Sequence, residues 1–160
     1  MNKQETYQYL KDHNIPFEIT EHRAVYNMEE LDSIDLPYPE GDAKNLFVRD
    51  DKKKNYYLIT VKGDKRVNLK DFRKAHGLRP LSFASPEDLK KYTDLTPGAV
   101  TPLGLLNVEG APITMYLDAE FKDSIIGIHP NENTATVWLQ GDDLVALLRE
   151  NGCEVEIVGI

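Results

Sequence analysis

The sequence is poor in cysteine and in long apolar runs, and each absence excludes a class of protein. Cys153 is the single cysteine, so the chain cannot form an internal disulfide, which fits a reducing compartment. No apolar run approaches the ~20 residues of a membrane-spanning helix. The first residues, Met1–Tyr7, contain no apolar core of a secretion signal. We therefore expect a cytoplasmic protein without a membrane segment.

Several catalytic motifs are also absent. There is no Gly-x-x-x-x-Gly-Lys-Ser/Thr phosphate loop, no Gly-x-Gly-x-x-Gly motif and no Gly-x-Ser-x-Gly nucleophile elbow. The histidines, His13, His22, His76 and His129, lack the spacing of metal ligands. Cys153 lies in an apolar run with no histidine nearby in sequence, which favours a core residue over a nucleophile. We expect no metal and no cofactor, so an enzyme of this sequence would hydrolyse its substrate without a covalent intermediate.

The length and composition are those of one soluble domain. A chain of 160 residues falls within the ~100–200 expected for a domain with a real core. Hydrophobic residues make up 41% and charged residues 29%, which is ordinary for a globular protein. No repeat, low-complexity tract or linker divides the sequence. We expect a single domain over residues 1–160.

Charge is unevenly distributed along the chain. The net charge of −8 argues by itself against nucleic-acid binding, yet 14 of the 19 Lys and Arg residues lie between residues 44 and 91. This basic segment (residues 44–91) carries a local charge of +8, while residues 1–43 carry −7 and residues 92–160 carry −9. A basic face on an acidic body is typical of a surface that binds a phosphate backbone. The same residues also fit a solvated hairpin tip and helix face.

Periodicity and capping residues predict alternating strands and helices. Ser85 followed by Pro86 is typical of a helix start, and Asn14 before Pro16 of a helix end. The expected helices are residues 3–13, a short helix at 27–30, one from Asn68 to Gly77, one opening at Ser85, and one from Asp142 or Asp143 to Gly152. The expected strands are residues 17–22, 45–49, 56–62, 81–84, 113–118, 124–129, 134–139 and 154–158. Because there is no strict βαβ rhythm, we expect an α+β fold with a curved, largely antiparallel sheet and flanking helices.

Asp42–Asp50 is the first of two stretches that place polar residues beside an apolar run. Lys44 begins the run Leu46–Val48, where a strand would leave the loop at Gly41. A lysine at a strand entrance can direct one ammonium into a cleft, as a point charge for a phosphate or a polarised carbonyl. The same spacing also fits a solvated lysine at a strand end.

Gly127–Val137 is the second such stretch. His129 precedes Pro130 and is therefore held extended, and Gly127 permits close approach of another backbone or a ligand. Backbone N–H groups here could face a developing oxyanion. The alternative is that His129 is a turn residue that bonds to its own loop.

Two further segments could wall a pocket. Thr101-Pro-Leu-Gly104 is a Pro/Gly turn, and Gly104 would leave room for a small group. Val25 and Tyr26 follow the first expected strand. An ordinary turn at Thr101–Gly104 and a core role for Val25 and Tyr26 fit the pattern equally well.

Taken together, these segments resemble the YbaK/ProX family of free-standing aminoacyl-tRNA editing domains, and most closely its ProX branch. The resemblance runs from about Leu10 to Ile157. It rests on the stretch Ala-Lys-Asn-Leu-Phe from Ala43, on Thr101–Gly104 and on the stretch Asn-Thr-Ala-Thr from Asn133. It implies the fold of the prolyl-tRNA synthetase editing insertion, and an enzyme that removes alanine from mischarged tRNA(Pro) without a metal.

The resemblance also implies roles for individual residues. Lys44 would hold the 3′ end of the tRNA, with Asn45 as a second polar contact, and Gly127 and His129 would complete the catalytic site. The residues implied to bind the aminoacyl group are Val25, Tyr26, Thr101, Gly104, Ile128 and Asn133. Those expected to contact the RNA backbone are Lys53, Lys54, Lys65, Arg66, Arg73 and Arg79.

The implied substrate is the acceptor end of tRNA(Pro) carrying alanine. A proline-sized site cannot reject alanine strongly, because each missing methylene is worth only ~1–3 kcal/mol. Prolyl-tRNA synthetase and an elongation factor are further candidate partners. Two alternatives remain: a deacylase for another ester such as Cys-tRNA(Pro) or Ser-tRNA, and a non-catalytic module that binds RNA or protein.

Overall fold

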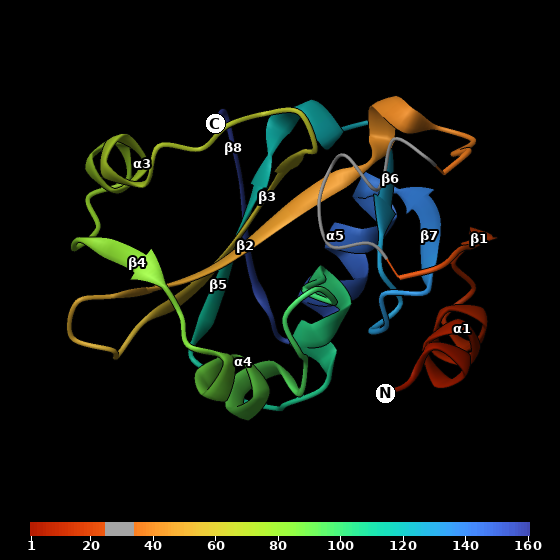
Figure 1. Ribbon diagram of the computed structural model, residues 1–160, viewed down its shortest axis with the longest axis horizontal. Coiled ribbons are helices and arrows are strands. Elements are labelled where there is room, and N and C mark those ends of the chain that lie inside the picture. Colours follow the sequence, from red (N-terminus) through yellow and green to blue (C-terminus); the bar gives the residue numbers. More distant parts are fainter. Residues whose placement is uncertain (25–33) are drawn as a thin grey trace.

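Two β-sheets organise the chain in the computed structural model, which describes residues 1–24 and 34–160. A five-stranded sheet has the order β4-β2-β3-β5-β8, and a three-stranded sheet has the order β1-β7-β6 (Figure 1). The strands are β1 (Glu18–Glu21), β2 (Ala43–Asp50), β3 (Tyr56–Lys62), β4 (Leu81–Phe83), β5 (Ile113–Asp118), β6 (Ile125–Ile128), β7 (Ala135–Gln140) and β8 (Glu154–Val158).

Side-chain caps fix where the helices begin. Asn2 and Glu5 form a capping box at the first helix, and the Ser85 hydroxyl accepts a hydrogen bond from the Asp88 N–H at 3.1 Å. The α-helices are α1 (Lys3–Asp12), α3 (Leu69–Ala75), α4 (Pro86–Thr93) and α5 (Gly141–Glu150). Short 3₁₀ turns are η1 (Pro39–Gly41), η2 (Pro102–Leu106) and η3 (Ala119–Phe121).

The expected elements within the described residues are confirmed, with boundaries shifted by one or two residues, and the helix expected at residues 27–30 lies outside them. One start differs in its cause. Helix α5 begins at Gly141, not at Asp142 or Asp143, and no side chain caps it. The Gly141 N–H donates to the Ser124 carbonyl at 2.8 Å, and a Cβ on Gly141 would lie 2.4 Å from the Phe121 carbonyl oxygen. Tertiary contact therefore sets this helix start.

The α+β fold with mostly antiparallel pairing is confirmed. β2 pairs antiparallel with β3 and β4, and β7 pairs antiparallel with β1 and β6. The division into two sheets was not predicted, and neither were the parallel pairs β3–β5 and β5–β8. Each parallel pair is joined by a long connection that contains helices, which is what parallel pairing requires.

The main core lies between the sheets and the helices that cover them. Phe47, Leu58 and Met115 meet Ile126 and Val137 there, and α5 contacts both β7 and β8. The other face of the five-stranded sheet carries a second cluster, Val48, Tyr57, Ile59, Val61, Phe72 and Tyr116. β3 is buried on both faces, as a central strand should be. Within residues 1–24 and 34–160, none of the helices has the length and apolar character needed to cross a bilayer.

Candidate functional site

The two sheets meet where β2 begins. Asp42 forms a parallel bridge to Gly127 of β6, which joins residues 85 positions apart. Polar groups from β2, β6 and β7 thereby line a small cavity of about 20 Å³, which we call the junction cavity. Its lining residues are Asp42, Ala43, Asn45, Gly127, Ile128, His129 and Thr136. The fold thus brings the two predicted stretches, around Lys44 and around His129, to one place.

His129 is held in one tautomer. Its Nδ1 lies 3.0 Å from the Ala135 carbonyl oxygen, which can only accept, so Nδ1 carries the proton and Nε2 is the basic nitrogen. Burial lowers the pKa of His129, and the neighbouring His22 contributes in the same direction. The imidazole is therefore neutral at physiological pH and can accept a proton at Nε2.

His22 and Thr136 complete this side of the cavity. The His22 ring lies edge-on to His129, with centroids 6.2 Å apart. Its Nδ1 donates to the Arg23 carbonyl at 2.7 Å, and in the neutral form of the ring the Thr136 hydroxyl donates to Nε2 at 2.9 Å. The oxygen of the buried Thr136 hydroxyl then keeps a lone pair for a further donor.

Asp42 was missed by the sequence analysis. Its half-buried carboxyl lines the junction cavity, and burial raises its pKa to about 6. A carboxyl titrating near neutral pH beside a neutral histidine can exchange a proton with water or substrate. The available signal was an acid between Gly41 and Lys44, but its importance depends on the distant bridge to Gly127.

Replacement of Asp42 by asparagine should stabilise the protein in a pH-dependent way. The unfolded carboxyl has a pKa of about 3.9. The raised folded-state pKa, about 6, means that the carboxyl does not penalise folding below pH 4 and costs up to about 3 kcal/mol once pH exceeds 6. The free energy of unfolding of Asp42→Asn should therefore exceed that of the wild type by about 1–3 kcal/mol at pH 8. The difference should shrink towards pH 4 in denaturant titrations.

The exposed Asp64 supplies the control for that experiment. Asp64→Asn removes an acid from the turn after β3, where the carboxylate is exposed. Its effect should be within about 0.5 kcal/mol at both pH values. A pH-independent gain for Asp42→Asn would contradict a burial penalty on Asp42.

An apolar groove adjoins the junction cavity. It has a volume of about 240 Å³ and shares Asn45 with that cavity. The remaining lining is mostly apolar and includes Leu46, Phe83, Leu89 and Val100. The Asn45 amide is oriented by the Thr60 hydroxyl, which donates to its Oδ1 at 2.7 Å. Asn45 therefore stands between a polar cavity and an apolar groove.

β2 presents backbone groups beside Asn45. The Gly63 N–H donates to the Asp42 carbonyl from the β3 side, and the Ala84 N–H donates to the Phe47 carbonyl from the other side. Because backbone groups alternate along a strand, the N–H and C=O of Asn45 point to that second side. β4 pairs with β2 only at Val48–Asp50. Among the described strands, none pairs with β2 at Asn45 on this edge, which makes its N–H a candidate oxyanion donor.

Lys44 lies on the opposite face of β2 from Asn45. Strand alternation places it with Leu46 and Val48, and its Nζ donates to the carbonyl oxygen of Lys65. Lys44 lines neither the junction cavity nor the groove. A substrate on this edge of β2 could contact Lys44 on one face and Asn45 on the other.

Packing or helix capping accounts for three other predicted site residues. A Cβ on Gly127 would lie 2.3 Å from the Trp138 ring, and one on Gly104 would lie 2.4 Å from Leu95. The buried Thr101 hydroxyl caps η2 by accepting from the Leu103 N–H at 3.4 Å. The space beside Gly104 is thus filled by Leu95, and Thr101 and Gly104 line neither the junction cavity nor the groove.

The remaining predicted pocket residues divide as follows. Ile128 is buried and lines the junction cavity. Asn133 is half-buried in the loop between β6 and β7. Val25 and Tyr26 lie outside the described residues.

Some predicted RNA-binding residues are engaged within the protein. Lys65 Nζ lies 2.5 Å from the buried Asp118 carboxylate and 3.3 Å from Glu120. Arg79 forms a two-pronged contact with Asp51 at 2.6 and 3.0 Å, and both side chains are exposed. Such an exposed pair contributes about 0–1 kcal/mol and can open. The other predicted RNA-binding residues lie in two places: Lys53 and Lys54 in the β2–β3 turn, and Arg66 and Arg73 before and on α3. Their role in RNA binding stays a prediction.

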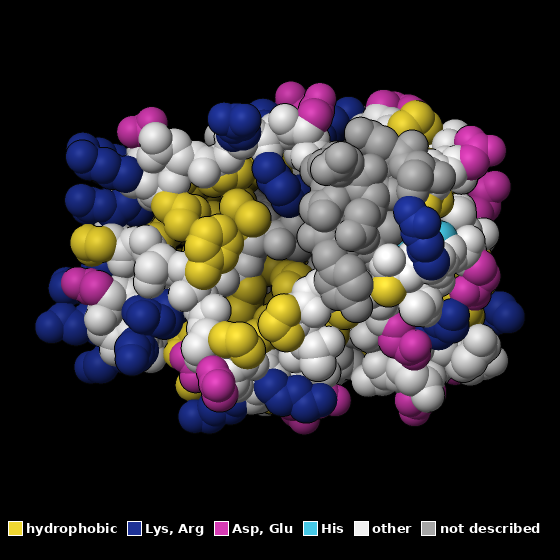
Figure 2. All heavy atoms as spheres, in the orientation of Figure 1, with side chains coloured by type: hydrophobic (Ala, Val, Ile, Leu, Met, Phe, Trp, Pro, Cys, Tyr) yellow, Lys and Arg dark blue, Asp and Glu magenta, His cyan; other side chains and the backbone are white. Residues whose placement is uncertain are grey.

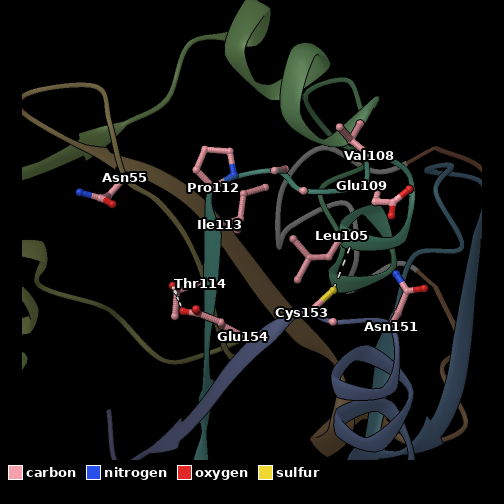
Figure 3. A pocket seen from close by; sticks show the side chains of 13 residues that line it. Asn55, Leu105, Val108, Glu109, Pro112, Ile113, Thr114, Asn151, Cys153 and Glu154 are labelled. Carbon is pink, nitrogen blue, oxygen red and sulfur yellow. Dashed lines mark hydrogen bonds between the residues drawn. The ribbon is translucent and has the colours of Figure 1, made fainter.

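A wider cavity of about 290 Å³ lies elsewhere, at the N-terminal ends of β5 and β8 (Figure 3). Cys153 lines it, and the Sγ–H donates to the Leu105 carbonyl at 3.8 Å. Burial raises the pKa of the Cys153 thiol, which is opposite to what a nucleophile requires. None of the predicted site residues lines this cavity, so its size does not make it the candidate site. In the described part of the chain, no group of His, Cys, Asp and Glu is arranged to hold a metal ion.

The described residues therefore define an α+β domain with a small polar cavity where two sheets meet, flanked by an apolar groove. The sequence model of the family described as "Aminoacyl-tRNA editing domain" matches residues 22–147. The prolyl-tRNA editing protein ProX of Acetoanaerobium sticklandii is 39% identical over 144 residues, covering 89% of this chain and 88% of that protein. The prolyl-tRNA synthetase associated domain-containing protein 1 of Mus musculus is 32% identical, covering 84% and 82%.

A solved structure shares the fold. It is described as a candidate trans-editing enzyme for prolyl tRNA synthetase and matches with a TM-score of 0.67 and 21% identity, over 98% of this chain and 96% of that one. The chain belongs to the aminoacyl-tRNA editing domain family, and the resemblance predicted from the sequence is confirmed.

Proposed function

We propose that the protein is a trans-editing deacylase that hydrolyses the ester of mischarged Ala-tRNA(Pro). The observation that carries the proposal is the 39% identity to a prolyl-tRNA editing protein over nearly the whole chain. The arrangement at the junction cavity supports it, because a neutral histidine, a carboxyl and a hydroxyl face a space beside the start of β2. The chain would act on tRNA charged by another protein.

The junction cavity is the proposed site of the hydrolytic water. A space of about 20 Å³ exceeds the ~10–15 Å³ that one water needs, and Asp42, His129 and Thr136 provide polar partners. The water oxygen attacks the ester carbonyl carbon while His129 Nε2 or the Asp42 carboxylate accepts its proton. The carbon–oxygen bond to the ribose then breaks, the ribose oxygen takes up a proton, and alanine leaves.

The negative charge that develops on the carbonyl oxygen needs a donor. Gly127 is paired with Trp138 on one side and bridged to Asp42 on the other, so its backbone has partners at both edges. The N–H of Asn45, on the edge of β2 that none of the described strands pairs at this position, is the better placed donor in this proposal. Lys44, on the other face of β2, would bind the terminal phosphate or polarise the carbonyl.

The test is hydrolysis of Ala-tRNA(Pro), Pro-tRNA(Pro) and Cys-tRNA(Pro) by the purified protein, with spontaneous hydrolysis as the background. We expect Ala-tRNA(Pro) to be cleaved at least ~10-fold faster than the others, the discrimination that ~1–3 kcal/mol for a difference of one methylene-sized group gives. Faster hydrolysis of Cys-tRNA(Pro) would show that the protein is a deacylase with a different substrate. Binding of tRNA without hydrolysis of any ester would overturn the proposal in favour of a binding module.

A further inference from the structure

Phe83 is an exposed aromatic side chain at the rim of the apolar groove. It is 63% exposed, compared with 42% for Ile19, the other large hydrophobic residue that is exposed in the described part of the chain. Phe83 ends β4, the short edge strand of the five-stranded sheet (Figure 1). It lines the groove together with Leu46, Pro86 and Val100. Single exposed apolar residues are ordinary, but one that continues an apolar groove indicates a contact surface.

The groove is built mainly from the part of the chain that is richest in Lys and Arg, although none of its lining residues is charged. Most of its lining comes from the basic segment (residues 44–91), whose local charge is +8. Figure 2 shows hydrophobic side chains gathered left of centre on one face, with Lys and Arg side chains and some Asp and Glu side chains around them. An aromatic platform within a positively charged surface is the combination that binds single-stranded nucleic acid.

The position of Phe83 relative to Lys44 fits a strand of nucleotides. Phe83 pairs with Val48, so its side chain is on the face of the sheet that carries Leu46 and Lys44. Val48 is four residues from Lys44, which is about 13 Å at 3.3 Å per residue. This corresponds to about four stacked nucleotides at 3.4 Å each.

We infer that Phe83 stacks on a nucleobase in the unpaired 3′ end of the tRNA, a few nucleotides before the aminoacylated ribose. The inference rests on the proposed function, since it takes Lys44 and Asn45 as the position of that ribose. The groove beneath Phe83 accepts the rest of the base. Its volume of about 240 Å³ is smaller than the ~300–1,000 Å³ of sites that bind drug-sized ligands. A ligand as small as a single base suits this volume.

The charge and size of this surface favour RNA over a protein partner. A stable protein interface buries ~800 Å² on each partner and has few charges at its centre. The exposed apolar part of this groove is small and surrounded by the basic segment. Stacking reads no base sequence by itself, so Phe83 would contribute affinity for the unpaired end and not the choice of tRNA.

The test measures RNA affinity and does not require hydrolysis. Uncharged hairpin RNAs with and without an unpaired four-nucleotide 3′ end are titrated against the wild type, Phe83→Ala and Phe83→Trp by fluorescence anisotropy. Phe83→Ala should weaken binding of the tailed hairpin by about 5- to 150-fold, the range that 1–3 kcal/mol of stacking gives, and leave the blunt hairpin unchanged. Phe83→Trp should bind the tailed hairpin at least as well as the wild type.

Two further variants keep the result interpretable. Ile19→Ala removes the exposed apolar residue of the other sheet and should not change either affinity. Phe83→Leu keeps an apolar side chain without a ring and should lose most of the tail-dependent affinity, even where the alanine variant folds poorly. Equal affinity of wild type and Phe83→Leu for the tailed hairpin would overturn the inference. So would an equal loss of affinity for both hairpins. These outcomes do not depend on whether the protein hydrolyses Ala-tRNA(Pro).

Discussion

Lys44→Ala should lower kcat/KM for Ala-tRNA(Pro) by about 100- to 1,000-fold. The ammonium is one point charge at the start of β2, half-buried and held by the Lys65 carbonyl. The ammonium can exchange that carbonyl for a phosphate or a developing oxyanion, because its hydrogen bond to a charged acceptor is stronger than its hydrogen bond to a neutral carbonyl. Loss of a single donor to a developing oxyanion typically costs about 2.7–4 kcal/mol of activation free energy. Single-turnover deacylation measures this loss directly.

The cost of the same change to stability should be small. Removing one net hydrogen bond to a backbone carbonyl costs about 0.5–1.5 kcal/mol. The free energy of unfolding, measured by urea titration, should therefore fall far less than the activation free energy rises. Lys44→Arg should recover only part of the activity, because a planar guanidinium cannot replace a compact ammonium at one point.

Lys62→Ala is the matched control. Lys62 is on β3 opposite Ala43, one register step from the Lys44–Val61 pair, and its side chain lies over the Phe121 ring. The Lys62→Ala substitution removes the same positive charge from a nearby position on the other face of the sheet. Deacylation at the wild-type rate by Lys44→Ala, or equal losses in Lys44→Ala and Lys62→Ala, would show that Lys44 has no specific role.

Elements set by local chemistry could be predicted from the sequence. Asn68 and Ser85 cap α3 and α4 as expected, because a cap depends only on the next three residues. Asn14 has a φ of 58°, as a residue that ends a helix often does. The parallel pairing of β5 with β8 could not be predicted in this way, since its partners are about 40 residues apart. Nothing in the local pattern selects that neighbour.

In the candidate site, too, features set by neighbouring residues could be predicted and features set by distant residues could not. The two stretches around Lys44 and His129 were recognisable because their residues are contiguous. Asp42 gains its raised pKa only from burial at the Gly127 bridge, which no local pattern contains. Gly104 illustrates the opposite case: its missing side chain suggested space, but Leu95 fills that space in the folded protein. A sequence indicates which residues are small, and only the fold shows what lies beside them.

Gly127→Ala should destabilise the protein by about 3 kcal/mol or more, which lowers Tm by roughly 6–12 °C for a chain of this length. A Cβ at this position would lie 2.3, 2.6 and 2.8 Å from three ring atoms of Trp138. The ring cannot move aside, since Trp138 is buried, its Nε1–H donates to Thr20 at 2.9 Å, and Tyr38 packs edge-on against it at 5.6 Å. Gly159→Ala is the control, because nothing lies within 4 Å of its Cβ position.

A double-mutant cycle with Trp138→Leu tests whether the ring causes the strain. Trp138→Leu alone should be destabilising, because it leaves a cavity beside Gly127. In the double variant the ring atoms nearest the new Cβ are gone, so Gly127→Ala should add little or no further loss. Full additivity of the two losses would contradict the clash and place the strain in the β6 backbone. Since Gly127 also forms the bridge to Asp42, the cycle separates a side-chain collision from damage to the bridge that builds the junction cavity.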